Sequence, residues 1–147
     1  MTTDTVDSAR STPWWFWVVA VLSLAWNAIG GHDYTMSHVQ GVAYLRQAGM
    51  SAAAVAYVES YPSWMHAVWA IGVWGAVAGS LLLLLRLRWA LHAFVLSFLG
   101  AAGSMAHTAI TPGGVAAMGL TFPGIICVVW LVLAWFSWAM TKRGVLR

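Results

Sequence analysis

The stretch PSWMHAVWAIGVWGAVAGSLLLLLRLRWALHAFVLSFLGAAGSMAHTAI, residues 62–110, decides the fold of this chain. It contains two apolar runs, residues 62–85 and 88–110, with Arg86 between them and Arg88 at the start of the second. Each run is as long as the roughly 20 apolar residues that a helix needs to cross the hydrocarbon of a bilayer. The connection between the runs has room only for a tight turn. The stretch therefore predicts an antiparallel pair of transmembrane helices.

The composition of the whole chain indicates the same class of protein. Of 147 residues, 61% are apolar and 7% are charged, whereas a soluble domain is roughly 45–50% apolar and about 25% charged. The net charge of +3 comes from so few residues that it does not favour nucleic-acid binding. The single cysteine, Cys127, excludes an internal disulfide and any site built from several cysteines. We expect an integral membrane protein with one domain.

Two further apolar runs complete an antiparallel bundle of four transmembrane helices. The first covers about residues 13–31, and the last covers about residues 119–141, with Pro123 near its start, where proline costs a helix little. None of the four runs alternates polar and apolar residues as a barrel strand does, so the expected fold is all-α. Residues 1–12 form a leader without the pattern of a cleaved signal peptide. Residues 13–147 then form a single transmembrane domain.

The basic residues indicate how the chain is oriented in the membrane. Of seven Lys and Arg residues, only Arg46 lies between the first and second spans. The other six precede the first span, follow the fourth, or lie between the second and third. Because cytoplasmic connections carry the excess of Lys and Arg, we expect a multi-pass protein with both termini in the cytoplasm. Residues 32–61 then form a loop on the outer side.

The outer loop divides at Gly49 into two segments of helical length. The segments SHVQGVAYLRQ (37–47) and SAAAVAYVES (51–60) are each too short to span a membrane. Ser51 has the residue type and the position of an N-cap. We expect two short helices on the outer face that bury Val39, Val42, Tyr44, Val55 and Tyr57. A continuous extension of the first helix as far as Gln47 is the alternative.

Small residues recur at helical spacing in the second and third apolar runs. Such residues allow two helix backbones to approach closely in a membrane. The candidates for helix packing are Gly72, Gly75, Ala76, Gly79, Ser80, Gly100, Gly103 and Ser104. Because a short turn joins the two runs, the pattern favours close packing within one chain. A seam between two copies of the chain is the alternative.

The ionisable residues suggest a site only at the outer side. No Asp, Glu, Lys or Arg lies in the middle of a span, which argues against a proton relay or a voltage sensor. We expect similar depths near the outer surface for four metal-binding candidates: His32, Asp33, His66 and His107. Such side chains bind zinc or copper, and an axial pair such as His66 and His107 binds haem.

The spacing of these candidates matches no metal-binding motif, so hydrogen bonding at the interface without any cofactor is the favoured interpretation. Equal depth also suggests that Asp33 pairs with His66 or His107, which would lock the outer ends of three helices together.

Asn27 and Trp69 are the candidates for a site deeper in the bundle. A buried amide must find hydrogen-bond partners, and we expect Asn27 to tie the first helix to Ser104 or Thr108. Four tryptophans lie deeper than an interfacial aromatic belt requires: Trp26, Trp69, Trp74 and Trp130. These rings either line a pocket for a quinone, a carotenoid or an acyl chain, or face lipid and neighbouring helices.

Four segments carry a resemblance to known proteins: WNAIGGHDY (26–34), YLRQAGM (44–50), the stretch from Ser60 to Gly100, and RGVLR (143–147). The most specific parts are the WN and DY pairs of the first segment and the run from Trp69 to Gly75. Together the four segments resemble a group of small four-span bacterial inner-membrane proteins that are loosely labelled "sugar transporter". The likeness covers most of the chain. It implies a bacterial inner membrane and a four-helix bundle, and it brings no catalytic residues. The sequence gives little support for a transporter function, because no interrupted helix pair or inverted repeat marks a site at the membrane midplane.

Two classes of function follow from these observations. The first is a non-catalytic accessory or scaffold subunit that acts through contacts with lipid or other helices, as a homo-oligomer or in a larger membrane complex. The second is a protein that binds a metal ion, haem or a small solute at the periplasmic side of the bundle. An enzyme is disfavoured, because no nucleophile and base stand at a recognisable spacing. The sequence favours the first class.

Overall fold

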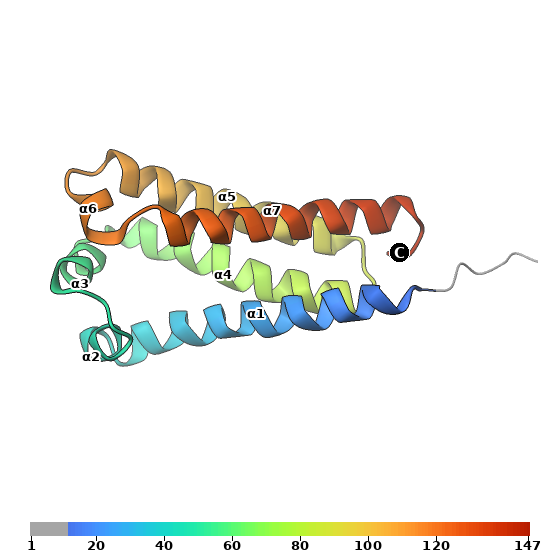
Figure 1. The fold of residues 1–147 in the computed structure, drawn as a ribbon, viewed down its shortest axis with the longest axis horizontal. Helices are drawn as coiled ribbons and strands as arrows, with labels where there is room; N and C mark the ends of the chain where they lie inside the picture. The colour runs from blue at the N-terminus through green and yellow to red at the C-terminus, as the bar shows by residue number, and fades with distance from the viewer. Residues whose placement is uncertain (1–11) are drawn as a thin grey trace, which may run out of the picture.

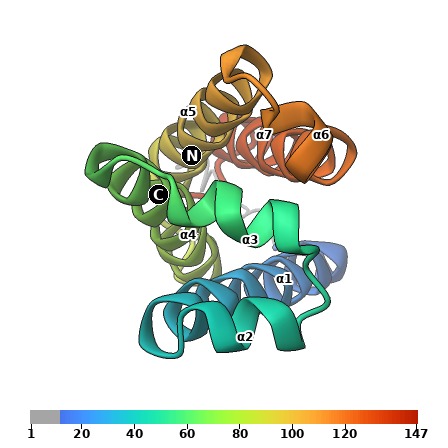
Figure 2. The same cartoon turned by 90° about the vertical axis from the view of Figure 1, so that its left-hand side faces the viewer.

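Four long helices form the body of the molecule in the computed structural model, which describes residues 12–147 (Figure 1). They are α1 (Trp14–Val39), α4 (Ser63–Leu84), α5 (Trp89–Ile110) and α7 (Thr121–Lys142), each long and apolar enough to cross a membrane. Three short helices lie at one end of the bundle: α2 (Val42–Gln47), α3 (Ala52–Glu59) and α6 (Gly114–Met118) (Figure 2).

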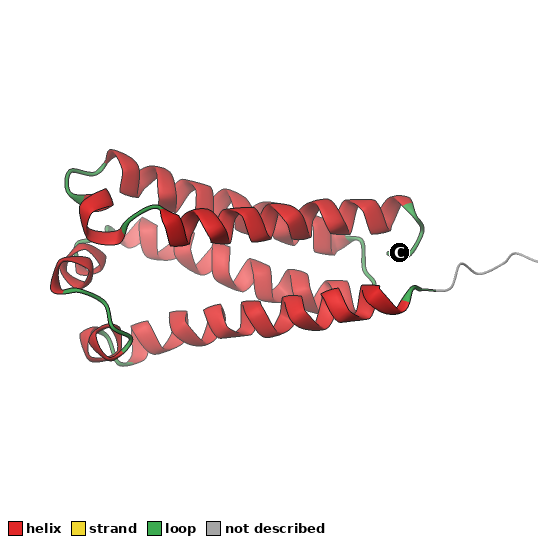
Figure 3. Cartoon of the chain, in the orientation of Figure 1, coloured by secondary structure: helices red, strands yellow, loops and turns green. Residues whose placement is uncertain are grey.

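We call the end that carries α2, α3 and α6 the capped end. The opposite end, where α1 begins and the chain finishes, is the terminal end (Figure 1). No residue from 12 to 147 forms a strand, as the colouring of Figure 3 makes plain. The all-α, four-span fold expected from the sequence is thus confirmed, whereas the leader lies outside the described residues except for Thr12.

The ends of the spans follow the apolar runs closely in three cases out of four. Helices α4, α5 and α7 begin and end within two residues of the expected bounds. The first apolar run ends at residue 31, but helix α1 continues without a break to Val39. His32, Asp33 and His38 therefore lie on a helix and not in a loop.

Local packing explains why α1 passes through Gly30 and Gly31. A glycine inside a helix costs only about 1 kcal/mol relative to alanine. A Cβ atom on Gly31 would lie 3.4 Å from the Val77 side chain, so the bare backbone packs against α4. Beyond this point the polar side chains bond to the carbonyl four residues earlier, as for Thr35 (2.8 Å), Ser37 (2.7 Å) and His38 (2.9 Å). The polar residues after Gly31 are therefore compatible with the helix, because their side chains bond to its own carbonyl groups.

The segment that follows α1 differs from both expectations for the outer loop. Gly41 has a φ of +57°, which favours glycine and separates α1 from α2. Neither a helix over 37–47 nor an extension to Gln47 forms. Val39 is 73% exposed and not buried as expected, whereas Val55 and Tyr57 are buried. Ser51 is the N-cap of α3 as expected, with its Oγ accepting from the Ala54 amide at 3.1 Å.

The long helices pack in the order α1, α4, α5, α7. Helix α4 packs against both α1 and α5, and α5 also packs against α7 (Figure 2). Helices α1 and α7 meet through large side chains: the Phe16 and Phe136 rings stack with centres 5.9 Å apart, and Trp15 contacts Phe136 at 6.0 Å. The buried core runs along this seam and between α4 and α5.

The small residues of α4 and α5 lie where these two helices touch. A Cβ atom on Gly75 would come within 2.6 Å of the Ser97 Oγ, and one on Gly79 within 3.0 Å of the Phe94 ring. A Cβ atom on Gly100 would lie 3.1 Å from the Gly72 Cα. Such distances leave no room for larger side chains, so the two backbones approach closely at these positions.

Three further packing candidates have other surroundings. Ala76 is fully buried, and Ser104 donates a long hydrogen bond to the Met65 sulfur at 3.8 Å. Gly103 lies at the edge of the contact, because a Cβ atom there would meet only the Val68 side chain at 4.0 Å. The face for close packing thus ends before Gly103.

At the terminal end, the tail of the chain is bonded to the turn between α4 and α5. Arg86 and Gly144 have positive φ angles of 58° and 71° and end α4 and α7 in the same way. The amide of Arg88 bonds to the Arg147 carbonyl, and the amide of Arg147 bonds to the Arg86 carbonyl, each at 2.8 Å. Val145 is buried, and its carbonyl accepts a hydrogen bond from the Arg86 Nε at 3.1 Å. The last residues therefore hold α4, α5 and α7 together.

Candidate functional site

Eight aromatic and imidazole rings meet at the capped end of the bundle. They come from α1, α3, α4, α5 and the α3–α4 connection, and each ring centre lies between 4.2 and 6.5 Å from another. We call this group the capped-end cluster: Tyr34, His38, Tyr57, Tyr61, Trp64, His66, Trp69 and His107. It brings together three of the five histidines of the chain.

One half of the cluster lies between α1 and α4. Tyr34 and His38 are one turn apart on α1, and their ring centres are 4.2 Å apart. The His38 ring lies 5.6 Å from Trp69 and 5.4 Å from His66, both on α4. The continuation of α1 beyond the expected end of the span is what places His38 against α4.

The other half of the cluster lies between α3, α4 and α5. The Tyr61 ring is centred 6.0 Å from both His66 and His107 and so connects the two halves. The Tyr57 hydroxyl lies 3.3 Å from the His107 Nδ1, within hydrogen-bonding distance. Helix α6 packs against Tyr57, because a Cβ atom on Gly114 would lie 3.0 Å from that hydroxyl. The Tyr57 hydroxyl of α3 thus lies between His107 of α5 and Gly114 of α6.

The tyrosines of this half share a partly desolvated environment. Burial raises the pKa of Tyr61, and the neighbouring Tyr57 phenol raises it further, while a hydrogen bond with Thr108 acts in the opposite direction. Tyr61 therefore remains a neutral hydrogen-bonding group at any physiological pH. It can accept or donate one bond to a ligand but does not supply a phenolate.

Two histidine nitrogens distinguish the cluster from simple aromatic packing. The His38 Nδ1 lies 2.9 Å from the Tyr34 carbonyl oxygen, to which it donates. The His66 Nδ1 is buried and has no hydrogen-bond partner in the described part of the chain. A buried polar atom without a partner costs about 1–3 kcal/mol. This nitrogen is therefore a place where a ligand atom would be stabilising.

The four metal-binding candidates do not come together as expected. His66 and His107 belong to the capped-end cluster, whereas Asp33 accepts a hydrogen bond from the Tyr44 hydroxyl of α2. The His32 ring also faces Tyr44, with ring centres 6.3 Å apart. Within residues 12–147, no three His, Cys, Asp or Glu side chains are grouped closely enough to hold a metal ion.

Helical phase explains this separation. Successive residues of α1 are rotated by about 100°, so Asp33 lies on a different face from Tyr34 and His38. The lock expected between Asp33 and His66 or His107 is replaced by the bond from Tyr44. That bond raises the pKa of Tyr44, with smaller contributions from desolvation and from the negative charge of Asp33.

Asn27 joins three helices in the interior of the bundle. Its Nδ2 donates to the Ser80 Oγ of α4 at 2.9 Å, and its Oδ1 accepts from the Trp130 Nε1 of α7 at 2.9 Å. Ser23 lies 2.7 Å from Ser80, which itself donates to the Ala76 carbonyl at 2.9 Å. Every member of this network has a partner, so the only buried amide side chain of the described residues is satisfied.

The partners expected for Asn27 were wrong. Ser104 bonds to Met65, and Thr108 donates to the Ser104 carbonyl at 3.1 Å. Both lie on α5, whereas α1 packs against α4. The sequence indicated that Asn27 needs a partner on another helix, but not which helix is its neighbour.

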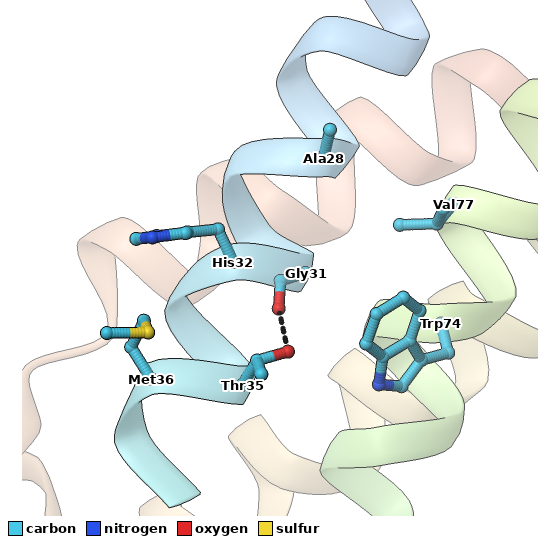
Figure 4. A pocket seen from close by; sticks show the side chains of 7 residues that line it. All are labelled: Ala28, Gly31, His32, Thr35, Met36, Trp74 and Val77. Atoms are coloured by element: carbon cyan, nitrogen blue, oxygen red, sulfur yellow. Dashed lines mark hydrogen bonds between the residues drawn. The ribbon is translucent and has the colours of Figure 1, made fainter. Parts of the chain in front are cut away.

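The four deep tryptophans have different surroundings. Trp130 is buried, and Trp69 belongs to the capped-end cluster. Trp26 and Trp74 are 43% and 48% exposed on the outside of the bundle. Trp74 borders a shallow groove of about 270 Å³ between α1 and α4, together with Ala28, Gly31, His32, Thr35, Met36 and Val77 (Figure 4). This groove opens outward, where bilayer lipid would surround the helices.

Sequence reasoning assigned His38 to a loop and left it out of the metal-binding candidates. Its spacing of four from Tyr34 was the available signal, but this signal has meaning only if the helix continues past Gly31.

No protein-family model, curated protein or solved structure matches this chain.

Proposed function

We propose that the chain is a non-catalytic protein of a bacterial inner membrane, an accessory or scaffold subunit that acts through contacts with lipid and with other helices. The hydrogen-bond network of Asn27 carries this proposal. Its donors and acceptors bond to one another across α1, α4 and α7. Polar groups in the interior thus hold the helices together and are not available for a substrate or an ion.

The exposed surface of α1 supports a role in assembly. Among the long helices, α1 has its close backbone contacts with α4. Large apolar side chains, such as Leu22 and Ile29, are each 63% exposed on its remaining surface. This surface suits either lipid or a helix of another subunit, since both are apolar. A homo-oligomer or a larger membrane complex is therefore the expected form of the protein.

Disulfide cross-linking in native membranes tests the assembly. In a Cys127→Ser background, a Leu22→Cys variant would place one thiol on α1, and a Leu99→Cys variant would serve as the matched control on α5. The two leucines are similarly exposed, at 63% and 60%. We expect a cross-linked dimer from Leu22→Cys and none from Leu99→Cys. A monomer from both, together with a monomeric mass by light scattering, would contradict a homo-oligomeric scaffold.

The second candidate function is the binding of a small ligand at the capped end. The unpartnered, buried Nδ1 of His66 favours it, because this atom lies among aromatic rings of the capped-end cluster. Native mass spectrometry of protein purified without added metal or imidazole would detect a bound ligand by its mass. An absorption spectrum and elemental analysis would identify haem, zinc or copper. Protein of the bare chain mass, with no metal, would speak against this function.

A further inference from the structure

The His38 and His66 rings have the separation of two imidazoles on one metal ion. Their centres are 5.4 Å apart, and their planes meet at 83°. With metal–nitrogen bonds of about 2.0–2.1 Å, two imidazoles on one tetrahedral ion have ring centres roughly 5–5.5 Å apart. The two rings come from α1 and α4, and the tertiary structure alone brings them together.

The tautomer of His38 leaves one of its ring nitrogens free to bind a metal ion. A carbonyl oxygen can only accept, so the His38 Nδ1, at 2.9 Å from the Tyr34 carbonyl, carries a hydrogen. In the neutral ring the lone pair is then on Nε2. Histidines that bind metals commonly donate their other nitrogen to a carbonyl in this way, which fixes the tautomer and the ring orientation.

His66 provides the second ligand. Its Nδ1 is buried and has no partner in residues 12–147. The Trp69 ring, 5.6 Å from His38, and the Tyr61 ring, 6.0 Å from His66, stand beside the pair. A metal–nitrogen bond would use a lone pair that no hydrogen bond satisfies.

We propose that His38 and His66 together bind one first-row metal dication of the class that prefers imidazole, such as Zn²⁺ or Cu²⁺. No third His, Cys, Asp or Glu of the described residues is close enough to join them. Because His38 is exposed at the capped end, water completes the coordination. The ion is therefore exchangeable. This inference rests on the second candidate function and is independent of the scaffold role.

Competition with a chelating dye would measure Zn²⁺ binding to the full chain, purified in mild detergent without a histidine tag. We expect one ion per chain. His38→Ala and His66→Gln should each weaken binding by at least about tenfold. His32→Ala and His92→Ala are the matched controls and should leave the affinity unchanged, because His32 faces Tyr44 and the exposed His92 lies near the terminal end of α5. Circular dichroism would show that all four variants keep their helices.

Electron paramagnetic resonance of bound Cu²⁺ gives a second measurement, with coupling to two imidazole nitrogens expected. Absence of zinc binding, binding that His38→Ala leaves intact, or a spectrum from a single nitrogen would overturn the proposal. A small molecule that copurifies with protein lacking zinc affinity would leave ligand binding at the capped end standing and would exclude only the metal.

Discussion

Asn27 shows how one residue can determine the association of three helices. In hydrocarbon an unsatisfied amide is costly, so its partners on α4 and α7 must be in place when the bundle forms. Trp130 reaches across from α7 to supply one of them. The Trp130 ring also packs against α4, because a Cβ atom on Gly72 would lie 3.4 Å from it. Asn27 thus stabilises the bundle because it lies where its amide can bond to both α4 and α7.

Replacement of Asn27 by Leu should therefore destabilise the bundle. The variant leaves the Trp130 Nε1 without its acceptor, and we expect a loss of about 1–2 kcal/mol in the free energy of unfolding. Unfolding in mixed micelles would measure this loss. Ser137→Ala is the matched control, since the hydroxyl of the buried Ser137 donates to the Leu133 carbonyl of its own helix at 2.8 Å and makes no bond to another helix within residues 12–147. Equal stability of both variants would argue against the network.

The bond between Tyr44 and Asp33 gives a prediction about pH. Because the folded protein raises the pKa of Tyr44, it binds this proton more tightly than the unfolded chain. The bond thus adds stability below the ordinary pKa of 10.0, and this contribution disappears as the pH rises through the higher folded value. Ultraviolet difference titration should show one phenol returning toward its ordinary pKa in Asp33→Asn. An unchanged titration curve would contradict the bond.

Among the elements, α4 and α5 form the closest pair. Their backbones touch at Gly72 and Gly100, so dispersion contacts along the pair replace the hydrophobic effect that is absent between helices in lipid. The seam continues to Gly75 and Gly79, where α5 side chains fit against bare backbone. The pair is therefore the part of the bundle that tolerates added volume least.

A pair of alanine variants tests this seam. Gly100→Ala would place a methyl group 3.1 Å from the Gly72 Cα, and we expect a loss of roughly 1–3 kcal/mol in stability from overpacking. Gly103→Ala would meet only a side-chain atom at 4.0 Å. It should be neutral or gain up to about 1 kcal/mol, because alanine favours a helix. Thermal unfolding in detergent would rank the variants, and the reverse order would exclude this packing.

At the scale of the whole molecule, charge is divided between the two ends of the bundle. The terminal end carries five basic residues: Arg86, Arg88, Lys142, Arg143 and Arg147. The acidic residues Asp33 and Glu59 are in or beside the capped end, together with Arg46. If the chain spans a membrane, this division favours the terminal end on the cytoplasmic side.

Labelling of intact cells with a thiol reagent that does not cross membranes would test this orientation. In a Cys127→Ser background, we expect Thr111→Cys to react from outside, because it lies in the connection between α5 and α6 at the capped end. Lys142→Cys, at the terminal end of α7, should react only after the membrane is made permeable. The opposite result would invert the orientation and place the capped-end cluster in the cytoplasm.

The sequence alone determined the class of the fold, the number of long helices and the bounds of three of them. These properties follow from the length of apolar runs and from turn residues, which act locally. The end of α1 could not be found in this way. Gly30 and Gly31 resemble a helix end in the sequence, and only the packing of Gly31 against Val77 shows that the helix continues.

Only the tertiary structure decided which side chains meet. Hydropathy does not encode the lateral order of helices or their rotation, and both were needed to pair Asn27 with Trp130. The same holds for His38 and His66, which approach each other because α1 extends past the apolar run and lies against α4. Residue types and depths can be obtained from the chain, whereas contacts between helices depend on the faces that pack together.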